Sequence, residues 1–396
     1  MTERPTHREG LILLTLLATS SLTVMAGATL SPALPAITVH FAEAPGAELL
    51  SRLVLTLPAL FIALFSPIGG LIADKLGRRP LLLWSTVLYV LAGSAGLVVD
   101  SLTALLASRA LLGIAVAGLM TASTTLIGDY FSDSRRNRVL GLQAACMAFG
   151  GVLFLLAGGL LADVHWRMPF LIYAVPIILL PLIMAIIREP GRGREGGIDQ
   201  VVDPDPPWAT FGGLYLMALL GMGLFYLLPV QIPYYLRELG YTSATVTGIA
   251  LSLNTVAAAL SSLAYRHVRS RMDPWSILLL TFLSIAVGLL LLFLAHGPAV
   301  LACGLILIGA GLGLLMPNLS QWLLAVAPRT IRGRVISGLT TSIFLGQFLS
   351  PLVTQPVSQA LGLRASFGLF AIVTLLVIVG IFMTRLIRQT TKRAAV

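Results

Sequence analysis

The sequence predicts an all-α integral membrane protein with twelve transmembrane helices. Of its 396 residues, 57% are hydrophobic and only 11% are charged, and the mean hydropathy is +0.94. Soluble domains carry about 25% charged residues, so the composition excludes an ordinary soluble protein. Many apolar runs reach 18 residues, enough for a membrane helix, and none shows the alternation of a β-barrel strand. Helices must therefore satisfy the backbone in the lipid.

Hydropathy and turn residues divide the chain into six spans, a linker and six more spans. The linker, residues 188–208, is polar and rich in Gly, Pro and charge. We therefore predict a six-helix bundle over 1–187, a cytoplasmic linker over 188–208 and a second six-helix bundle over 209–396. The expected spans are 11–37, 50–73, 80–99, 101–128, 138–162, 167–187, 209–236, 243–264, 274–295, 297–327, 332–360 and 364–388.

The positions of the basic residues predict the orientation of the chain in the membrane. A net charge of +10 by itself could indicate a nucleic-acid partner, but 21 of the 26 Lys and Arg residues lie in alternate connections between spans. This is the positive-inside pattern of membrane proteins. We therefore expect no nucleic-acid partner, and a multi-pass protein of the cytoplasmic (inner) membrane with both termini in the cytoplasm. The first span shows no clear cleavage site, and we expect it to be retained.

Metal, disulfide and enzyme chemistry have little support. The two cysteines, Cys146 and Cys303, lie in apolar runs without the spacing of metal ligands. The chain shows no nucleotide-binding loop and no catalytic-triad spacing. We expect no metal, no cofactor and no enzyme activity.

A charged island between the second and third spans carries the most specific motif. Residues 70–79 read Gly-Leu-Ile-Ala-Asp-Lys-Leu-Gly-Arg-Arg. This pattern resembles the loop signature of the major facilitator superfamily. The resemblance implies the major facilitator fold, with two six-helix pseudo-repeats, and a gate in which the acid and the bases latch the cytoplasmic side. The alternative is that the bases only fix topology. The gate candidates are Gly70, Asp74, Lys75, Gly77, Arg78 and Arg79.

The two halves of the chain repeat each other weakly. Shifted by 196 positions, residues 113–120 align with residues 309–316, which have a similar pattern of glycines. Shifted by 191 positions, residues 73–78 align with residues 264–269, where the acid is lost. Repeats of this kind place a transporter's substrate site at mid-membrane, between the halves.

Arg109 is the only charged residue expected well inside a span. It lies about 12 Å from the outer end of the fourth span, at 1.5 Å per residue. A charge at this depth is costly and by default indicates function. Together with Gly113, it resembles the Arg-x-x-x-Gly motif of the superfamily, which is linked to proton transfer. The alternative is an architectural Arg bonded to carbonyl groups. Asp100, the nearest acid in sequence, is a second coupling candidate.

The fifth span resembles the "antiporter" motif of drug exporters in the same superfamily. Its glycines match, but Phe154 and Leu155 replace the expected Gly-Pro pair. Small residues let membrane helices approach closely, so we predict helix packing here without inferring a direction of exchange. The glycines concerned are Gly141, Gly150, Gly158 and Gly159.

The resemblance implies a substrate cavity lined by the first, fourth, seventh and tenth spans with help from four others, and their polar residues are sparse. For each amide, a bond between helices is as reasonable as contact with substrate, and threonines can bond to their own helix. The cavity candidates are Thr19, Thr23, Gln143, Tyr226, Gln231, Asn254, Asn318 and Gln321.

No acidic residue is expected at mid-membrane. A buried carboxylate would be the ordinary proton carrier and the ordinary partner of a cationic drug. We therefore predict a monomeric secondary transporter of the twelve-span drug/metabolite:proton antiporter type, exporting a neutral or anionic amphiphile (a drug, siderophore or metabolite) by alternating access. The alternatives are an importer or uncoupled facilitator of an organic anion, and a non-transporting sensor or scaffold with the same fold.

Overall fold

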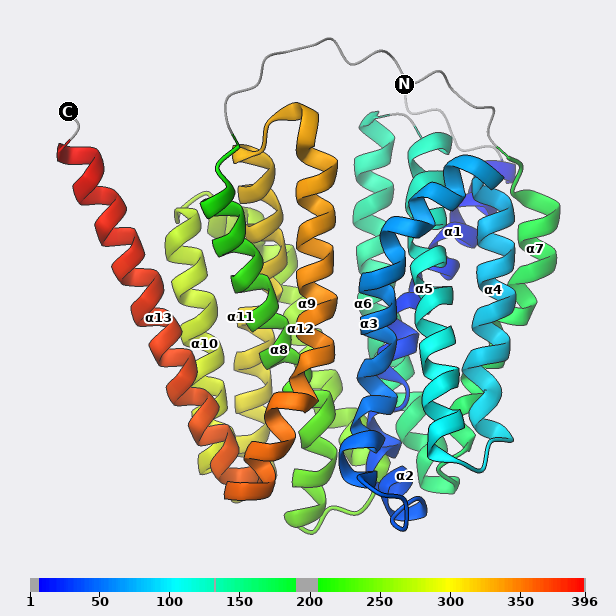
Figure 1. The fold of residues 1–396 in the computed structure, drawn as a ribbon, viewed down its shortest axis with the longest axis horizontal. Coiled ribbons are helices and arrows are strands. Elements are labelled where there is room, and N and C mark those ends of the chain that lie inside the picture. The colour runs from blue at the N-terminus through cyan, green and yellow to red at the C-terminus, as the bar shows by residue number, and fades with distance from the viewer. Residues whose placement is uncertain (1–6, 132, 190–205, 395–396) are drawn as a thin grey trace. The chain divides into compact units, whose positions relative to one another are not determined.

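The chain folds as an all-helical membrane protein. The computed structural model describes residues 7–131, 133–189 and 206–394, and no strand occurs among them. Twelve helices in these ranges are long and apolar enough to cross a membrane (Figure 1). The predicted twelve-span, all-α fold is confirmed.

The helices group into two compact units. The first comprises Met1–Val201 together with Ser243–Ile249, and the second comprises Val202–Thr242 and Ala250–Val396. Most of the predicted linker, residues 190–205, lies outside the described residues, so its boundaries stay a prediction. The segment 243–249 was expected in the second bundle, but it packs with the first unit.

The first unit contains the first six spans. In the first span a short 3₁₀ turn interrupts the helix, with Pro32 in its first turn and Pro35 in the first turn of α2. Proline lacks the N–H that a helix interior needs, which explains the break. The elements are α1 (His7–Ala28), η1 (Ser31–Ala33), α2 (Leu34–His40), α3 (Ala47–Leu76), α4 (Arg78–Ser94), η2 (Ala95–Leu97), α5 (Leu102–Tyr130), α6 (Asp133–Val164), η3 (Met168–Ile178) and α7 (Leu179–Ile186).

The second unit contains the last six spans, with only α9 reaching into the first unit. Its elements are α8 (Trp208–Glu238), α9 (Ala244–Arg269), α10 (Pro274–Leu294), α11 (Pro298–Val326), η4 (Arg329–Ile331), α12 (Arg332–Leu361) and α13 (Leu363–Ala394).

The repeat between the halves appears in the packing of two glycines. A Cβ atom added at Gly113 of α5 would lie 2.4 Å from the carbonyl oxygen of Pro58 in α3. A Cβ atom at Gly309 of α11 would lie 2.2 Å from the carbonyl oxygen of Asn254 in α9. Both positions therefore require glycine, because the neighbouring helix passes directly over the backbone. The glycine motif brings α5 onto α3 in one unit and α11 onto α9 in the other.

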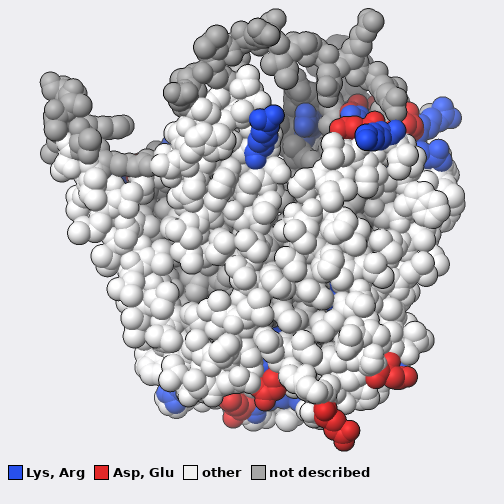
Figure 2. Space-filling view, viewed as in Figure 1, with Lys and Arg blue, Asp and Glu red and all other residues white. Residues whose placement is uncertain are grey.

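Charged side chains gather at the ends of the helices. Figure 2 shows Lys, Arg, Asp and Glu near the ends, with a broad band almost free of them between. An uncharged band of this kind is what a lipid core demands of the helices that cross it. The charges that remain inside the band are therefore the first places to look for function.

Candidate functional site

The Arg109 side chain is fully buried inside the first unit. Its Nη2 donates hydrogen bonds to the carbonyl oxygens of Ala92 at 2.8 Å and Gly93 at 2.7 Å, both in α4. Its Nε donates a longer bond of 3.4 Å to the Ser108 hydroxyl. Among the described residues no carboxylate lies within ion-pairing distance of it. Neutral groups, chiefly two backbone carbonyls, therefore stabilise its charge.

Two aromatic rings enclose the guanidinium of Arg109. Its central carbon lies 5.1 Å from the ring centroids of both Phe170 and Tyr173, which η3 contributes. Such cation–π contacts are strongest where water is excluded. Glycines of α4 and η2 admit the rings: a Cβ atom at Gly93 would come within 2.5 Å of Tyr173, and one at Gly96 within 2.2 Å of Phe170.

Two tyrosines extend this cluster to α1. The Tyr89 hydroxyl donates to the carbonyl oxygen of Leu22 at 2.9 Å, and the Tyr173 hydroxyl donates to that of Ala26 at 3.2 Å. Both tyrosines are fully buried. Neither tyrosine is predictable as a site residue from the sequence, because a tyrosine in an apolar run does not differ from a packing residue until its neighbours are known.

The chemistry open to Arg109 is electrostatic. A guanidinium keeps its proton in proteins, so Arg109 supplies a fixed positive charge and does not carry protons itself. Its Nη1 atom is buried and has no hydrogen-bond partner in the described part of the chain. The bonds from Nη2 to backbone carbonyls fit an architectural Arg. The unpartnered Nη1 leaves a donor that a functional Arg109 could use.

Asp100 does not lie with Arg109. Its carboxylate pairs with the guanidinium of Arg167, which stacks over the Trp166 ring at 4.9 Å. The Asp100 side chain is 82% exposed. The structure therefore separates the two coupling candidates, and a coupling role for either stays a prediction.

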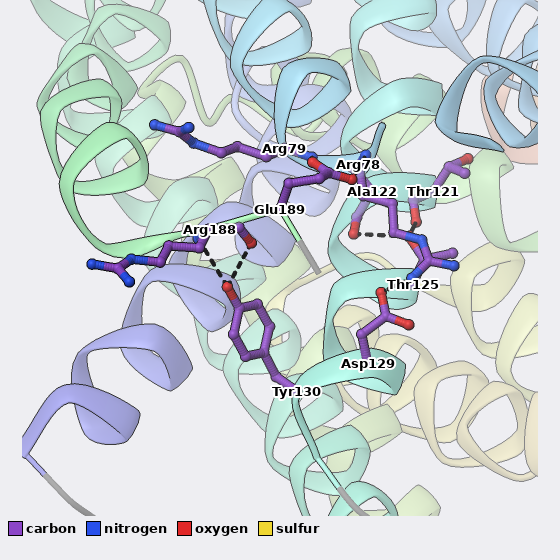
Figure 3. A network of polar contacts seen from close by, with 9 residues as sticks. All are labelled: Arg78, Arg79, Thr121, Ala122, Thr125, Asp129, Tyr130, Arg188 and Glu189. Atoms are coloured by element: carbon purple, nitrogen blue, oxygen red, sulfur yellow. Dashed lines mark hydrogen bonds and ion pairs between the residues drawn. The ribbon is translucent and has the colours of Figure 1, made fainter. Parts of the chain in front are cut away.

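The motif between α3 and α4 turns at Gly77. Its φ of +104° lies in the region that only glycine adopts readily. The backbone N–H groups of Arg78 and Arg79, which begin α4, donate to the two carboxylate oxygens of Glu189, each at 2.7 Å (Figure 3). A Cβ atom at position 77 would lie 2.9 Å from the Glu189 carboxyl. Glu189 thus caps α4, and both requirements explain the glycine.

The Arg78 side chain continues this network to α5. It pairs with Asp129, next to Tyr130 in the sequence. The Tyr130 hydroxyl donates to the carbonyl oxygen of Arg188 at 2.7 Å and accepts from its N–H at 2.9 Å (Figure 3). The first residues of the predicted linker, Arg188 and Glu189, are therefore bonded to the end of α5 and the start of α4. We define the Glu189 network as Arg78, Arg79, Asp129, Tyr130, Arg188 and Glu189.

The carboxylate of Asp74, by contrast, makes no hydrogen bond or ion pair with a described residue, and the side chain is exposed. Lys75 is exposed as well, and Gly70 has open space where a Cβ would lie. The latch role of these three residues stays a prediction. The second half of the motif, from Gly77 onward, begins α4 and binds Glu189.

The glycines of α6 differ in how tightly they are packed. A Cβ atom at Gly158 would lie 2.2 Å from the carbonyl oxygen of Thr29, and one at Gly159 would lie 2.8 Å from a carbonyl oxygen at the start of α9. At Gly150 the nearest atoms are in ordinary contact or slightly closer, and at Gly141 none lies within 4 Å. Close helix approach is therefore concentrated at the last two positions.

The cavity candidates of the first unit bond to their own helices or to a neighbour. The Thr19 hydroxyl donates to the Thr15 carbonyl at 3.0 Å, and the Thr23 hydroxyl donates to the Ser20 carbonyl at 2.8 Å. The Gln143 Nε2 donates to the Ser20 hydroxyl at 2.7 Å, joining α6 to α1. The alternative of bonds between or within helices therefore accounts for the donors of all three.

The amides of the second unit join pairs of helices. The Gln231 Nε2 in α8 donates to the Thr354 hydroxyl in α12 at 3.2 Å. The Asn254 Nδ2 in α9 donates to the Leu305 carbonyl in α11 at 2.9 Å. The Gln231 Oε1 is buried without a hydrogen-bond partner in the described residues, and contact of these amides with a substrate stays a prediction.

Two of the remaining candidates, Asn318 and Gln321, lie where α11 meets α10 and α9. The Asn318 Nδ2 donates to the carbonyl oxygen of Pro274 at 3.0 Å. The Tyr265 hydroxyl lies 3.4 Å from the Gln321 Oε1. Tyr226 of α8 is half-buried, and its ring packs edge-on against a neighbouring Phe. In the described ranges no group of three or more His, Cys, Asp or Glu residues could hold a metal ion.

The family follows from a comparison of the whole sequence. The profile of the Major Facilitator Superfamily matches residues 16–351 and matches again over residues 214–395. The chain belongs to the major facilitator superfamily. The resemblance carried by residues 70–79 is confirmed, and the protein is a membrane transporter of this superfamily.

The proteins similar to this chain include transporters of different names. The multidrug resistance protein MdtG of Salmonella arizonae is 29% identical over 339 residues, which cover 82% of each chain. A bacterial homolog of the human lysosomal transporter Spinster, solved inward-facing and occupied, superposes with a TM-score of 0.82 at 17% identity over 96% of this chain and 97% of its own. A D-xylose–proton symporter gives 0.73 at 15% identity, over 92% and 97%. At these identities the two structures show the fold alone.

The partners of Arg78 and Arg79 in the Glu189 network could not be predicted from the sequence. Residue 189 falls within the predicted linker, and the sequence does not single out Asp129. Their only signal in the sequence was position, since both stand at the same expected membrane surface as Arg78. Which of several acids at that surface meets Arg78 depends on how α4, α5 and α7 pack.

Proposed function

We propose that this superfamily transporter exports a neutral or anionic amphiphilic small molecule by alternating access, in exchange for protons. The observation that carries the proposal is the distribution of charge along the described spans. Arg109 is the charged residue deepest within a span, and the acidic residues of the spans all lie near their ends. A cavity built from these helices offers a cation and no buried carboxylate.

This distribution selects the charge of the substrate. A cationic compound would meet a positive field in a low-dielectric medium, where Coulomb interactions are strong. The same field would attract an anion, or a neutral molecule with acceptor groups. The apolar composition of the helices favours an amphiphile, because a highly hydroxylated substrate would need more polar side chains than the spans provide.

Outward transport is supported by the relative named a multidrug resistance protein, at 29% identity. The positive-inside pattern supports a protein of the inner membrane with both termini and the Glu189 network on the cytoplasmic side. We further propose that the protein acts as a monomer, with the two bundles alternating around the substrate.

A second candidate is an importer or facilitator of an organic anion without proton coupling. The same distribution of charge favours it, because proton coupling ordinarily uses a buried carboxylate and the described spans hold none away from their ends. The two candidates share Arg109 and differ in direction and coupling.

Transport by proteoliposomes with and without an imposed pH gradient tests the proposal. The panel contains neutral, anionic and cationic amphiphiles, and the variants are Arg109→Ala and Arg109→Lys. Arg237→Ala is the matched control, since that side chain is exposed at the end of α8. We expect a neutral or anionic compound to move only with the gradient, with the rate falling at least about tenfold in Arg109→Ala. Equal rates without a gradient would establish the facilitator, and preferred transport of cations would contradict the proposed substrate class.

A further inference from the structure

Asp163, near the end of α6, binds the first residues of α9. Its Oδ1 accepts a hydrogen bond of 2.6 Å from the N–H of Ala244. Its Oδ2 accepts bonds of 3.0 Å from the N–H of Thr245, 2.5 Å from the Thr245 hydroxyl and 2.7 Å from the Ser243 hydroxyl. One carboxylate thus takes four donors from three consecutive residues, all of which lie in the first unit.

This contact fulfils the role of a helix cap, supplied by another helix. The first N–H groups of an α-helix have no partner within it, and the helix dipole favours a negative charge there. Caps usually come from the residue just before the helix. Here Ser243 stands at that position, and its hydroxyl donates to Asp163. The start of α9 is therefore held by α6.

The helices also approach closely below the cap. Leu155, Gly159 and Asp163 are spaced by four residues and share one face of α6. A Cβ atom at Gly159 would lie 2.8 Å from the Ala244 carbonyl oxygen, and one at Gly248 would lie 2.5 Å from the Leu155 carbonyl oxygen. The two backbones touch through small residues, so the contact has little attraction of its own beyond packing. Asp163 supplies the directional bonds.

Helix α9 belongs to both units, since its first residues through Ile249 pack with the first unit and the rest with the second. We propose that Asp163 is a positioning residue for transport. Its carboxylate holds the start of α9 to α6 in the state described by the structure, and must release it when the bundles separate at this end of the membrane. The inference rests on the alternating access proposed above.

A buried reporter cysteine measures the release directly. Leu155 is 5% exposed beneath the contact, so Leu155→Cys should react with a maleimide only when α6 and α9 part. Cys146 and Cys303 are first replaced by Ser. In nanodiscs, Asp163→Asn should raise the labelling rate roughly tenfold, because the amide offers one neutral acceptor oxygen to four donors that bind two charged oxygens in the wild type. Thr245→Val, which keeps both backbone donors, should raise it less, and Asp163→Glu should restore part of the protection.

Two controls separate release from general damage. Glu43→Gln removes an exposed negative charge from the loop after α2 and should leave the labelling of Leu155→Cys unchanged. A cysteine at Leu112, fully buried in α5, should stay protected in Asp163→Asn, since only the α6–α9 contact opens. Equal labelling of Leu155→Cys in Asp163→Asn and Glu43→Gln, or equal gains at positions 155 and 112, would overturn the proposal.

The proposed function is judged separately by transport. If Asp163→Asn exposes position 155 but the wild-type protein moves no compound of the panel, the contact stands and the proposed function fails. If transport is found and Asp163→Asn leaves both its rate and the exposure of position 155 unchanged, the proposed function stands and Asp163 is not a positioning residue.

Discussion

Asp100 forms an ion pair with Arg167, which links the segment after η2 to the start of η3. The guanidinium of Arg167 also donates to the carbonyl oxygens of Leu97 and Val99, each at 3.3 Å. Arg167 therefore neutralises the carboxylate and also caps the carbonyl groups at the C-terminal end of η2. Coupling of Asp100 to the buried Arg109 would require this arrangement to change.

The two partners of this pair should differ in their effect on stability. Asp100→Asn removes a charge from a side chain that is 82% exposed, so we expect a loss under about 1 kcal/mol. Arg167→Ala strips the bonds to two carbonyls and the stacking on Trp166 as well, and should cost about 1–3 kcal/mol. Thermal unfolding in detergent measures both. A larger loss for Asp100→Asn than for Arg167→Ala would contradict this reading of the pair.

Two glycines of α6 should respond oppositely to alanine. Gly158→Ala places a Cβ atom 2.2 Å from the Thr29 carbonyl oxygen, which backbone shifts must relieve, and overpacking of this kind costs about 1–3 kcal/mol. Gly141→Ala meets no atom within 4 Å and should be neutral or stabilising by up to about 1 kcal/mol, from helix propensity. Melting temperatures of the two variants provide the comparison. If both variants melt alike, close approach at Gly158 is not needed.

Glu189 should protect the first amides of α4. In Glu189→Ala the N–H groups of Arg78 and Arg79 lose their acceptors, so their hydrogen exchange should accelerate about tenfold. Asp74→Asn is the matched control, because that acid is close in sequence and makes no bond with a described residue. Mass spectrometry of a peptide covering residues 77–82 reports the rate. Unchanged exchange in Glu189→Ala would show that water caps the helix equally well.

The fold was predictable because a lipid environment constrains composition. Each span must be apolar over its length, so twelve spans could be counted from hydropathy. The bases between spans predict the side of the membrane on which each connection lies. The glycine pairs at 113 and 309 were visible for the same reason, since close packing without large side chains leaves a pattern. The breaks near Pro32 and Pro176 needed the structure to locate them.

The contacts of the site were not predictable to the same degree. Glu189 meets the backbone of Arg78 from 111 positions away, and Asp163 meets Thr245 from 82 positions away. Nothing in the local sequence distinguishes these acids from others at the span ends. Their roles depend on which helix ends the packing brings together, and backbone N–H groups, which every residue carries, leave no pattern in the sequence.

The start of α10 should make the stability of the second unit depend on pH. Asp273 accepts bonds from the Ser276 hydroxyl at 2.5 Å and from Arg385 at 3.1 Å. Burial alone would raise the pKa of its carboxyl, but these bonds, the Arg385 charge and the backbone N–H of Trp275 together hold that pKa below its usual value. The folded state thus favours the ionised form. The stabilisation is complete above the ordinary pKa of about 3.9 and is lost as pH falls through the lower folded value.

Asp273→Asn isolates this charge, because asparagine keeps an oxygen that can cap the helix. The Asp273 side chain is 44% exposed, so we expect a loss of about 0.5–1 kcal/mol at pH 7. Thermal unfolding at pH 7 and at pH 3 should show the difference from wild type shrinking with acid. In the double variant with Arg385→Ala, the two losses should not add, since each removes the same ion pair. A difference that persists undiminished to pH 3 would show that the carboxylate charge contributes nothing, and that the cap alone holds the start of α10.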